Sequence, residues 1–148
     1  MKYNQEVSIK NSTLDEIKQN FQNPDFIKFL ITGQPVKILK WEGIQNNMEA
    51  HFKIWLFKWH IMSVYHSNFI SSDNNFKFQD NGKILPFGLI KWLHIHKVYK
   101  KNNVVIIKDE LSFEHKNKFL GFFIYPIMVF PIAIRKILYP IYFKFLKK

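Results

Sequence analysis

The sequence predicts an α+β fold with an antiparallel sheet of about seven strands. Three observations predict it: an alternating segment precedes two short helical patterns, six further strand-like segments follow, and the chain ends in a long apolar helical segment. The chain has 148 residues, of which 47% are hydrophobic and 18% aromatic. That is enough to bury the core of one ordinary domain, so we expect a single domain spanning 1–148.

The N-terminal elements have clear local signals. Residues 3–10 alternate apolar and polar side chains, which is typical of a half-buried strand. Thr13 and Glu16 have the spacing of a capping box, which predicts a short helix over 13–22. Pro24 ends that helix and can occupy the first turn of a second one, over 24–30.

The middle of the chain reads as strands separated by turn residues. The predicted strands cover 35–43, 49–57, 58–68, 74–80, 89–99 and 103–114. Turn signals fall at Glu42-Gly43, Asn46-Asn47, Asp73-Asn74 and Asp80-Asn81-Gly82. Asn102-Asn103 would join the last two strands, because asparagine tolerates positive φ.

The apolar segment 119–134 allows three interpretations. Its sixteen residues reach ~24 Å as a helix, short of the ~30 Å hydrocarbon core of a bilayer. Pro126 and Pro131 also weaken a membrane span. We therefore expect a helix buried inside a curled sheet, with a membrane-surface anchor and a true span as the alternatives. Pro140 should kink the helix or end it, so the tail beyond is expected to be irregular.

A two-residue turn at Asn102-Asn103 fixes the register of the last hairpin. His96 then lies opposite Asp109, and alternation gives the hairpin one apolar face and one charged face. The apolar face should point inward, towards a cavity. Its members, the candidate site residues, are Trp92, His94, His96, Val98, Ile107, Asp109, Leu111 and Phe113.

A buried carboxylate needs a partner, and His96 is placed to be that partner. Three interpretations stay open: a satisfied polar pair in a core, a polar anchor in a ligand cavity, or a catalytic or metal role. His94, His96 and Asp109 are similar to a two-histidine, one-carboxylate site, as in cupins. Cupins continue with a glutamate where this chain has Lys100 and Lys101, so we expect no metal and no cofactor.

Other features narrow the class of protein. His51, His60 and His66 lie in predicted strands, and each alone is more typical of a core or surface position than of a ligand. No cysteine, phosphate loop or nucleophile elbow occurs. The net charge is +11, but one arginine among 22 basic residues does not favour nucleic-acid binding. No acidic residue follows Glu114, so the C-terminal third is basic and apolar.

The order of elements resembles the START-like superfamily, also called SRPBCC, and its small bacterial ligand-binding members above all. The likeness rests on KWLHIHKVY at 91–99, IIKDELSFE at 106–114 and FLGFF at 119–123. The resemblance implies a helix-grip fold, in which a curved sheet wraps around the C-terminal helix and encloses a hydrophobic cavity. Two departures are that only Gly121 remains of a proline and glycine pair before that helix, and that LYPIYFKFL at 138–146 replaces an arginine-bearing end.

The leading hypothesis is that the protein binds or carries a hydrophobic small molecule or lipid, with His96 and Asp109 at its polar end. One alternative is a cyclase or dehydratase using that pair as general base and orienting group. The other is a membrane-associated interaction protein that uses the basic, apolar C-terminus. The absence of an apolar leader at the N-terminus predicts a cytoplasmic location, with peripheral membrane contact as an option.

Overall fold

The computed structural model describes residues 1–147; Lys148, one of the basic residues of the C-terminal segment, lies outside the described part. The strands are β1 (Lys2–Ile9), β2 (Val36–Trp41), β3 (Glu49–Leu56), β4 (Lys58–Ser71), β5 (Asn75–Ile84), β6 (Leu89–Lys101) and β7 (Val104–His115). The helices are α1 (Leu14–Phe21), α2 (Pro24–Leu30), α3 (Lys118–Ala133), α4 (Arg135–Ile141) and a π-helical turn (Tyr142–Leu146).

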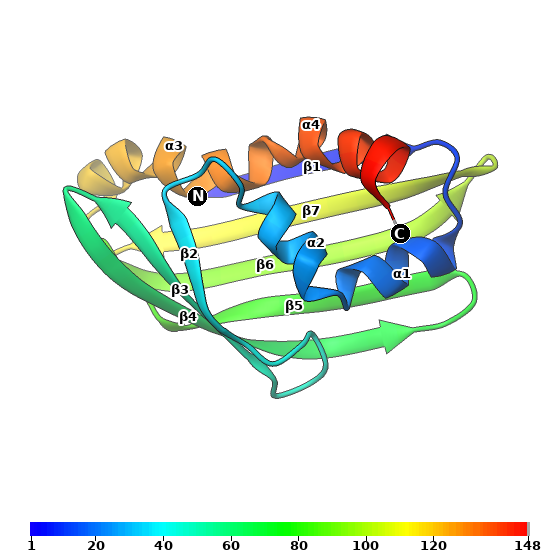
Figure 1. Cartoon of the computed structure of the whole chain (residues 1–148). Helices are drawn as coiled ribbons and strands as arrows, with labels where there is room; N and C mark the ends of the chain where they lie inside the picture. Colours follow the sequence, from blue (N-terminus) through cyan, green and yellow to red (C-terminus); the bar gives the residue numbers. More distant parts are fainter. Residues whose placement is uncertain (148) are drawn as a thin grey trace.

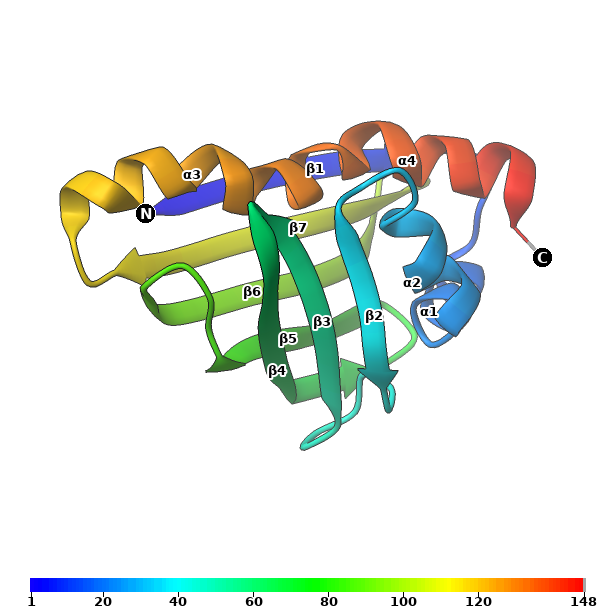
Figure 2. The same ribbon diagram turned by 60° about the vertical axis from the view of Figure 1, so that its left-hand side comes forward.

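The seven strands form one antiparallel sheet in the order β1-β7-β6-β5-β4-β3-β2. The sheet curves, so that β2, β3 and β4 turn up towards the C-terminal helix (Figures 1 and 2). That helix runs along the β1 side of the sheet, while α1 and α2 lie over the concave face (Figure 1). The predicted α+β plan, including the two short helices after the first strand, is confirmed.

Local signals explain the two short helices. Thr13 caps α1 by accepting a hydrogen bond from the Glu16 N–H, and the Glu16 carboxylate accepts one from the Thr13 N–H, which completes the predicted capping box. Asn23 caps α2, and Pro24 occupies its first turn. The pair therefore begins and ends where the sequence indicates.

The hairpin of β6 and β7 has the predicted register. Asn102 and Asn103 have φ values of 49° and 62°, which lie in the left-handed region that this two-residue turn needs. His96 pairs with Asp109, and Trp92 pairs with Phe113. Alternation therefore sends His94, His96 and Asp109 to the same, inner face of the sheet.

The fold has two apolar cores on the inner face. One lies beneath α1, α2 and α4, and its fully buried members include Phe21, Phe26, Phe76 and Tyr139. The other lies beneath α3, where Met128, Val129 and Ile132 pack over Trp92, Leu111 and Phe113. Between the two cores lies a group of buried polar side chains.

One predicted turn is wrong. Asp80, Asn81 and Gly82 continue β5: all three pair with β4, and Asp80 and Asn81 also pair with β6. The chain turns instead at Pro86, Phe87 and Gly88, where φ reaches 58° at Phe87 and 76° at Gly88. The Asp-Asn-Gly triplet fails as a turn because Asp80 has partners on both neighbouring strands, which favour the sheet over a local reversal.

The C-terminal helix is less buried than predicted. Its inner side holds Gly121, Met128, Val129 and Ile132, but Phe119 is 72% exposed and Phe122 is 75% exposed. The helical segment Lys118–Leu146 is long and apolar enough to cross a membrane by length and composition, and 22% of its most apolar window is buried. The expectation of a helix covered on several sides is therefore wrong: the sheet covers one side.

The helix also continues through the predicted break. α3 passes into α4 at Ile134, and helical structure runs through Pro140 to Leu146, with a π-helical last turn. Phe143 and Tyr142 are buried against Phe26, which holds this last turn in place. Packing onto α2 thus outweighs the proline penalty, and the prediction of an irregular tail is wrong for the described residues.

Candidate functional site

The polar group between the two cores is built by the register of four strands. In one row across the sheet, His66 of β4 pairs with Asp80 of β5, which pairs with His94 of β6. In the next row, His96 pairs with Asp109 of β7. Side chains in adjacent rows on one face are neighbours, so these five groups converge.

Asp109 is fully buried and lies among donors. Its Oδ1 is 3.0 Å from His94 Nε2, and its Oδ2 accepts a hydrogen bond of 2.9 Å from the Gln5 side-chain amide. The second amide hydrogen of Gln5 goes to the Ile132 carbonyl, 2.8 Å away. Gln5 therefore ties the carboxylate of β7 to both β1 and α3.

Asp80 is the second carboxylate of the group. Its Oδ2 lies 3.1 Å from His96 Nε2 and 3.6 Å from His94 Nδ1, while its Oδ1 lies 3.2 Å from His66 Nε2. His66 in turn places Nδ1 2.9 Å from the Met48 carbonyl. Three histidines thus each aim one ring nitrogen at the same carboxylate.

The C-terminal helix closes the group from above. Arg135 Nη1 is 3.9 Å from Asp109 Oδ1, and the Tyr139 hydroxyl donates a hydrogen bond to the same oxygen at 3.4 Å. Both residues belong to α4. Arg135, the one arginine in the sequence, therefore contacts this cluster.

Burial and charge act against each other here. Burial favours protonated carboxyls, but His96 and the other histidines hold the pKa of Asp80 well below its ordinary value. The same balance, set by His94, His96 and Arg135, lowers the pKa of Asp109. Burial disfavours the charged imidazole of His96, but the attraction of the Asp80 and Asp109 carboxylates outweighs it, so the pKa of His96 is raised.

A cavity of about 70 Å³ adjoins this cluster, between the sheet and the two short helices. His66, Asp80, His96 and Arg135 form its polar wall. The rest of the wall is apolar and consists of Phe21, Ile27, Leu30, Ile31, Trp41, Ile44, Ala50, Phe52, Val64 and Phe78. The cavity is smaller than the ~300–1,000 Å³ typical of sites for drug-sized ligands.

The predicted site residues fall into three groups. His96 lines the cavity, whereas His94 and Asp109 lie in the polar cluster behind it. The other five are core residues: Trp92, Leu111 and Phe113 beneath α3, and Val98 and Ile107 in the core beneath α1, α2 and α4. Their contact with a ligand stays a prediction.

Five members of the cluster are not predicted from the sequence. Asp80 is assigned to a turn, His66 is considered alone, and Gln5, Arg135 and Tyr139 are not connected with the hairpin. A usable signal existed for Asp80: continuing the alternation of Phe76 and Phe78 places it on the inner face. Arg135 gave a weaker signal, as a lone arginine in an apolar segment.

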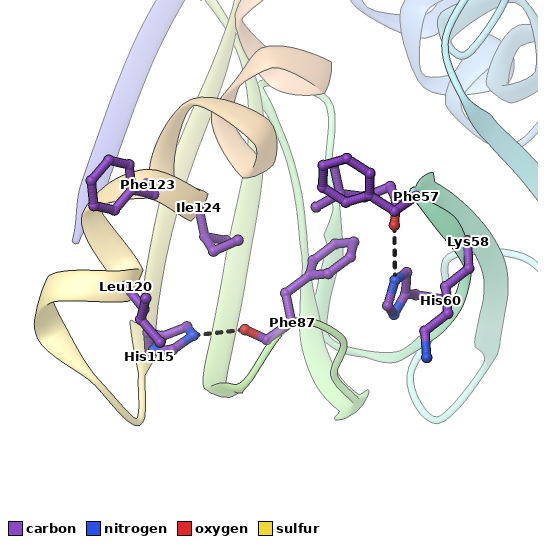
Figure 3. Close-up of a pocket in the computed structure, with 9 residues that line it drawn as sticks. Phe57, Lys58, His60, Phe87, His115, Leu120, Phe123 and Ile124 are labelled. Carbon is purple, nitrogen blue, oxygen red and sulfur yellow. Dashed lines mark hydrogen bonds between the residues drawn. The ribbon is translucent and has the colours of Figure 1, made fainter.

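A second, open cleft of about 460 Å³ lies at the other end of the molecule (Figure 3). The β3–β4 turn, Phe87 and the start of α3 line it, and His115 and His60 each bond a backbone carbonyl there, of Phe87 and Leu56. Phe57 at the turn is 90% exposed with φ of 59°. This cleft is almost wholly apolar.

Known structures share this fold. Norcoclaurine synthase from Thalictrum flavum, solved in complex with dopamine and hydroxybenzaldehyde, matches with a TM-score of 0.62 and 16% identity, over 93% of this chain and 83% of that chain. The Aha1 dimer from Colwellia psychrerythraea gives 0.60 and 13%, over 100% and 99%. Major latex-like protein 151 from Panax ginseng gives 0.60 and 11%, over 93% and 95%.

No protein-family model and no curated protein matches the sequence at a significant level. The structural likeness establishes the fold alone. The chain has the helix-grip fold that the resemblance to the START-like superfamily implies.

Proposed function

We propose that the protein binds an apolar small molecule or lipid in the cavity beneath α1 and α2. The observation that carries the proposal is the composition of the cavity wall, which is apolar except for one polar patch of His66, Asp80, His96 and Arg135. Such a wall suits a ligand with an apolar body and one polar end, because a few convergent polar groups fix its orientation.

The size of the cavity says how the ligand enters. About 70 Å³ accommodates only a small group of atoms, so a larger ligand requires α2 to move outwards. α2 is seven residues long and packs on the core through the buried side chains of Phe26 and Leu30; the Phe26 ring lies 4.6 Å from that of Tyr142. A helix of two turns with few buried side chains is a suitable lid.

Native mass spectrometry of the full chain, with thermal shift assays against fatty acyl, sterol and aromatic compounds, tests the proposal. We expect a retained or added ligand mass and a raised Tm. Ile31→Trp places an indole in the cavity wall and should abolish both effects, whereas Ile90→Trp, on the outer surface, should preserve them. A wild-type chain with no adduct and no thermal shift would remove the basis for this function.

A second proposal, peripheral membrane contact, rests on the outward face of the C-terminal helix. We define this face by its exposed apolar side chains: Phe119, Phe122, Phe123, Phe130, Ile137, Ile141 and Phe145. They recur at helical spacing, and Lys118, Lys136 and Lys144 are exposed beside them with no acidic residue after Glu114. An apolar stripe flanked by lysines suits a surface of anionic lipid.

Vesicle flotation tests this contact directly. The wild-type chain should float with vesicles that contain phosphatidylserine and much less with phosphatidylcholine alone. The variant Phe119→Ser, Phe122→Ser and Phe123→Ser should lose flotation, while Ile84→Ser and Ile90→Ser, exposed apolar changes on other elements, should retain it. Equal flotation of both variants would contradict the assignment to this face.

A further inference from the structure

The three histidines of the cluster, His66, His94 and His96, do not carry enough N–H groups for all of their polar contacts. Each of their six ring nitrogens lies within 3.6 Å of an oxygen atom. A neutral imidazole carries one N–H, so three neutral rings can donate a hydrogen bond in only three of those six contacts. The other three nitrogens would direct a lone pair at an oxygen lone pair, which is repulsive.

Protonating all three rings does not solve the problem. Three imidazolium ions with Arg135 would place four positive charges against the two carboxylates of Asp80 and Asp109, in a group where His94 and Asp109 are 2% and 0% exposed. Unbalanced buried charge is costly. Asp80 Oδ1 and His96 Nδ1 moreover have no hydrogen bond of acceptable geometry although both atoms are buried.

The nitrogens divide into an inner and an outer set. The inner set is His66 Nε2, His94 Nδ1 and His96 Nε2, and all three face the Asp80 carboxylate. The outer set consists of the second nitrogen of each ring. His94 Nε2 and His96 Nδ1 face Asp109, and His66 Nδ1 faces a backbone carbonyl. Histidines that bind metals show the same division, since the second N–H is given to a carboxylate or a carbonyl.

The distances also fit a metal centre. Tetrahedral zinc with bonds of ~2.0–2.1 Å separates its ligand atoms by about 3.3 Å. His96 Nε2 and His94 Nδ1 lie 3.1 and 3.6 Å from Asp80 Oδ2, and one ligand atom of each of these three residues lies within 4.8 Å of the others. His66 Nε2 lies 3.2 Å from Asp80 Oδ1, within reach as a fourth donor.

We propose that Asp80, His94 and His96 bind a first-row divalent metal ion, with His66 as the fourth donor. The ion replaces the missing protons: it occupies the inner nitrogens, and each neutral ring then donates its one N–H outwards. Three imidazole donors beside one carboxylate favour zinc, nickel and iron over magnesium and calcium, because imidazole suits the former ions and all-oxygen sites suit the latter. Since Asp80, His96 and His66 also line the cavity, the ion would adjoin it. This site is independent of whether the cavity takes an apolar ligand.

Metal binding is measured on the full chain after treatment with EDTA and desalting. Zn²⁺ is titrated in competition with a chromophoric chelator, and metal content is determined by elemental analysis. We expect one zinc per chain. Asp80→Asn and His96→Gln should each weaken binding by more than the roughly 10–100-fold typical of losing an outer-shell group. His66→Gln should weaken it less than either.

The control variants are His51→Gln and His60→Gln, because these histidines lie outside the cluster and His51 forms a surface pair with Glu49. Both should bind zinc as the wild type does. Loss of binding in His51→Gln, or unchanged binding in His96→Gln, would overturn the proposal. Stoichiometric binding at the Glu49 and His51 pair would therefore be recognised as such.

A measurement on the wild type covers the case in which the cluster variants fail to fold. Nitrogen-15 NMR of the histidine rings reports which nitrogen binds the ion. Addition of Zn²⁺ should leave His94 as an Nε2–H ring, bound through Nδ1, and should leave His66 and His96 as Nδ1–H rings, bound through Nε2. Zinc that shifts only the rings of His51, His60 or His115, or no ring, contradicts the site.

Discussion

The inner face of the sheet and the outward face of the C-terminal helix differ in burial and in the number of protein contacts that their side chains make. Asp109, on the sheet, is 0% exposed and has contacts from two neighbouring strands, β1 and β6, and from α4. Phe122, on the helix, is 75% exposed. Asp109 therefore has partners on several elements, whereas the recorded ring contact of Phe122 is with its neighbour Phe123 on the same helix.

The two faces should therefore differ in how sensitive they are to substitution. A buried ionic cluster tolerates few changes, because each group is the partner of another. An exposed aromatic stripe is expected to contribute little to folding, and we propose that it contacts a lipid surface. Four predictions follow that comparison, from the site with the most partners to the one with the fewest.

Asp109→Ala should have the largest effect. Removal of one member leaves His94, Arg135 and Gln5 without their carboxylate, and breaking a buried ion pair costs about 3–5 kcal/mol. Chemical denaturation of metal-free protein measures it. Glu110→Ala is the matched control, since its side chain lies on the outer face of the same strand and pairs with Lys97 at 2.9 Å, a pair expected to contribute less than about 1 kcal/mol. Equal losses would refute the difference between the two faces.

The pH dependence of metal-free protein should show the cluster as well. The raised pKa of His96 means that its contribution is complete below the ordinary histidine pKa of about 6.5 and is lost as pH rises through the folded value. The lowered pKa values of Asp80 and Asp109 mean that their contribution is complete above about 4 and is lost as pH falls through their folded values. Stability should therefore peak between about pH 4 and 6.5.

His96→Gln provides the control for that profile. In the variant the decline above about pH 6.5 should disappear, whereas the decline at acid pH should remain because both carboxylates are retained. Urea denaturation in the presence of EDTA, repeated across pH, gives both profiles. A wild-type chain whose stability rises steadily from pH 6 to pH 9 would show that His96 is not held as a cation.

The same contrast explains what the sequence could predict. Period-two alternation and the Asn102-Asn103 turn determine the register of the last hairpin, so the neighbourhood of His96 and Asp109 followed from local residues. Asp80 and His66 could not be added in this way, because their positions depend on the pairing of β4 with β5, which contains register shifts at Ser63/Val64 and Ser67/Ile70. Long-range pairing across irregular strands is not a local signal.

The predicted burial of the helix over 119–134 is wrong for a different reason. Apolar residues on all sides of 119–134 predict that something covers the whole helix, but the pattern does not say whether the cover is protein or lipid. The sheet supplies cover only on the side of Gly121, where an added Cβ would lie 2.9 Å from His115 Cβ, a contact that only glycine avoids. We propose that the membrane surface covers the remaining apolar residues.

Tyr139→Phe should lower the free energy of unfolding less than Asp109→Ala or His96→Gln. It removes the one hydroxyl that links α4 to Asp109, a long hydrogen bond of 3.4 Å, and should cost about 0.5–1.5 kcal/mol while the ring still fills its place in the core. Tyr125→Phe, which removes a hydrogen bond to the Lys2 carbonyl at the exposed side of α3, is the control and should cost less. A larger loss from Tyr125→Phe would mean that the hydroxyl contact of α3, rather than that of α4, holds the C-terminal helix on the sheet.

Phe122→Ser should have the smallest effect on folding. Its ring is largely exposed, and surface substitutions usually change the free energy of unfolding by no more than about 0.5 kcal/mol. Met128→Ala, on the inner side of the same helix at 4% exposure, should cost about 2–5 kcal/mol. Denaturation measures both, and a Phe122→Ser loss of similar size would mean that this face is covered in solution, as by a second copy of the chain. Both sides of the helix would then contribute to folding, and the proposal that the outward face contacts a lipid surface would be wrong.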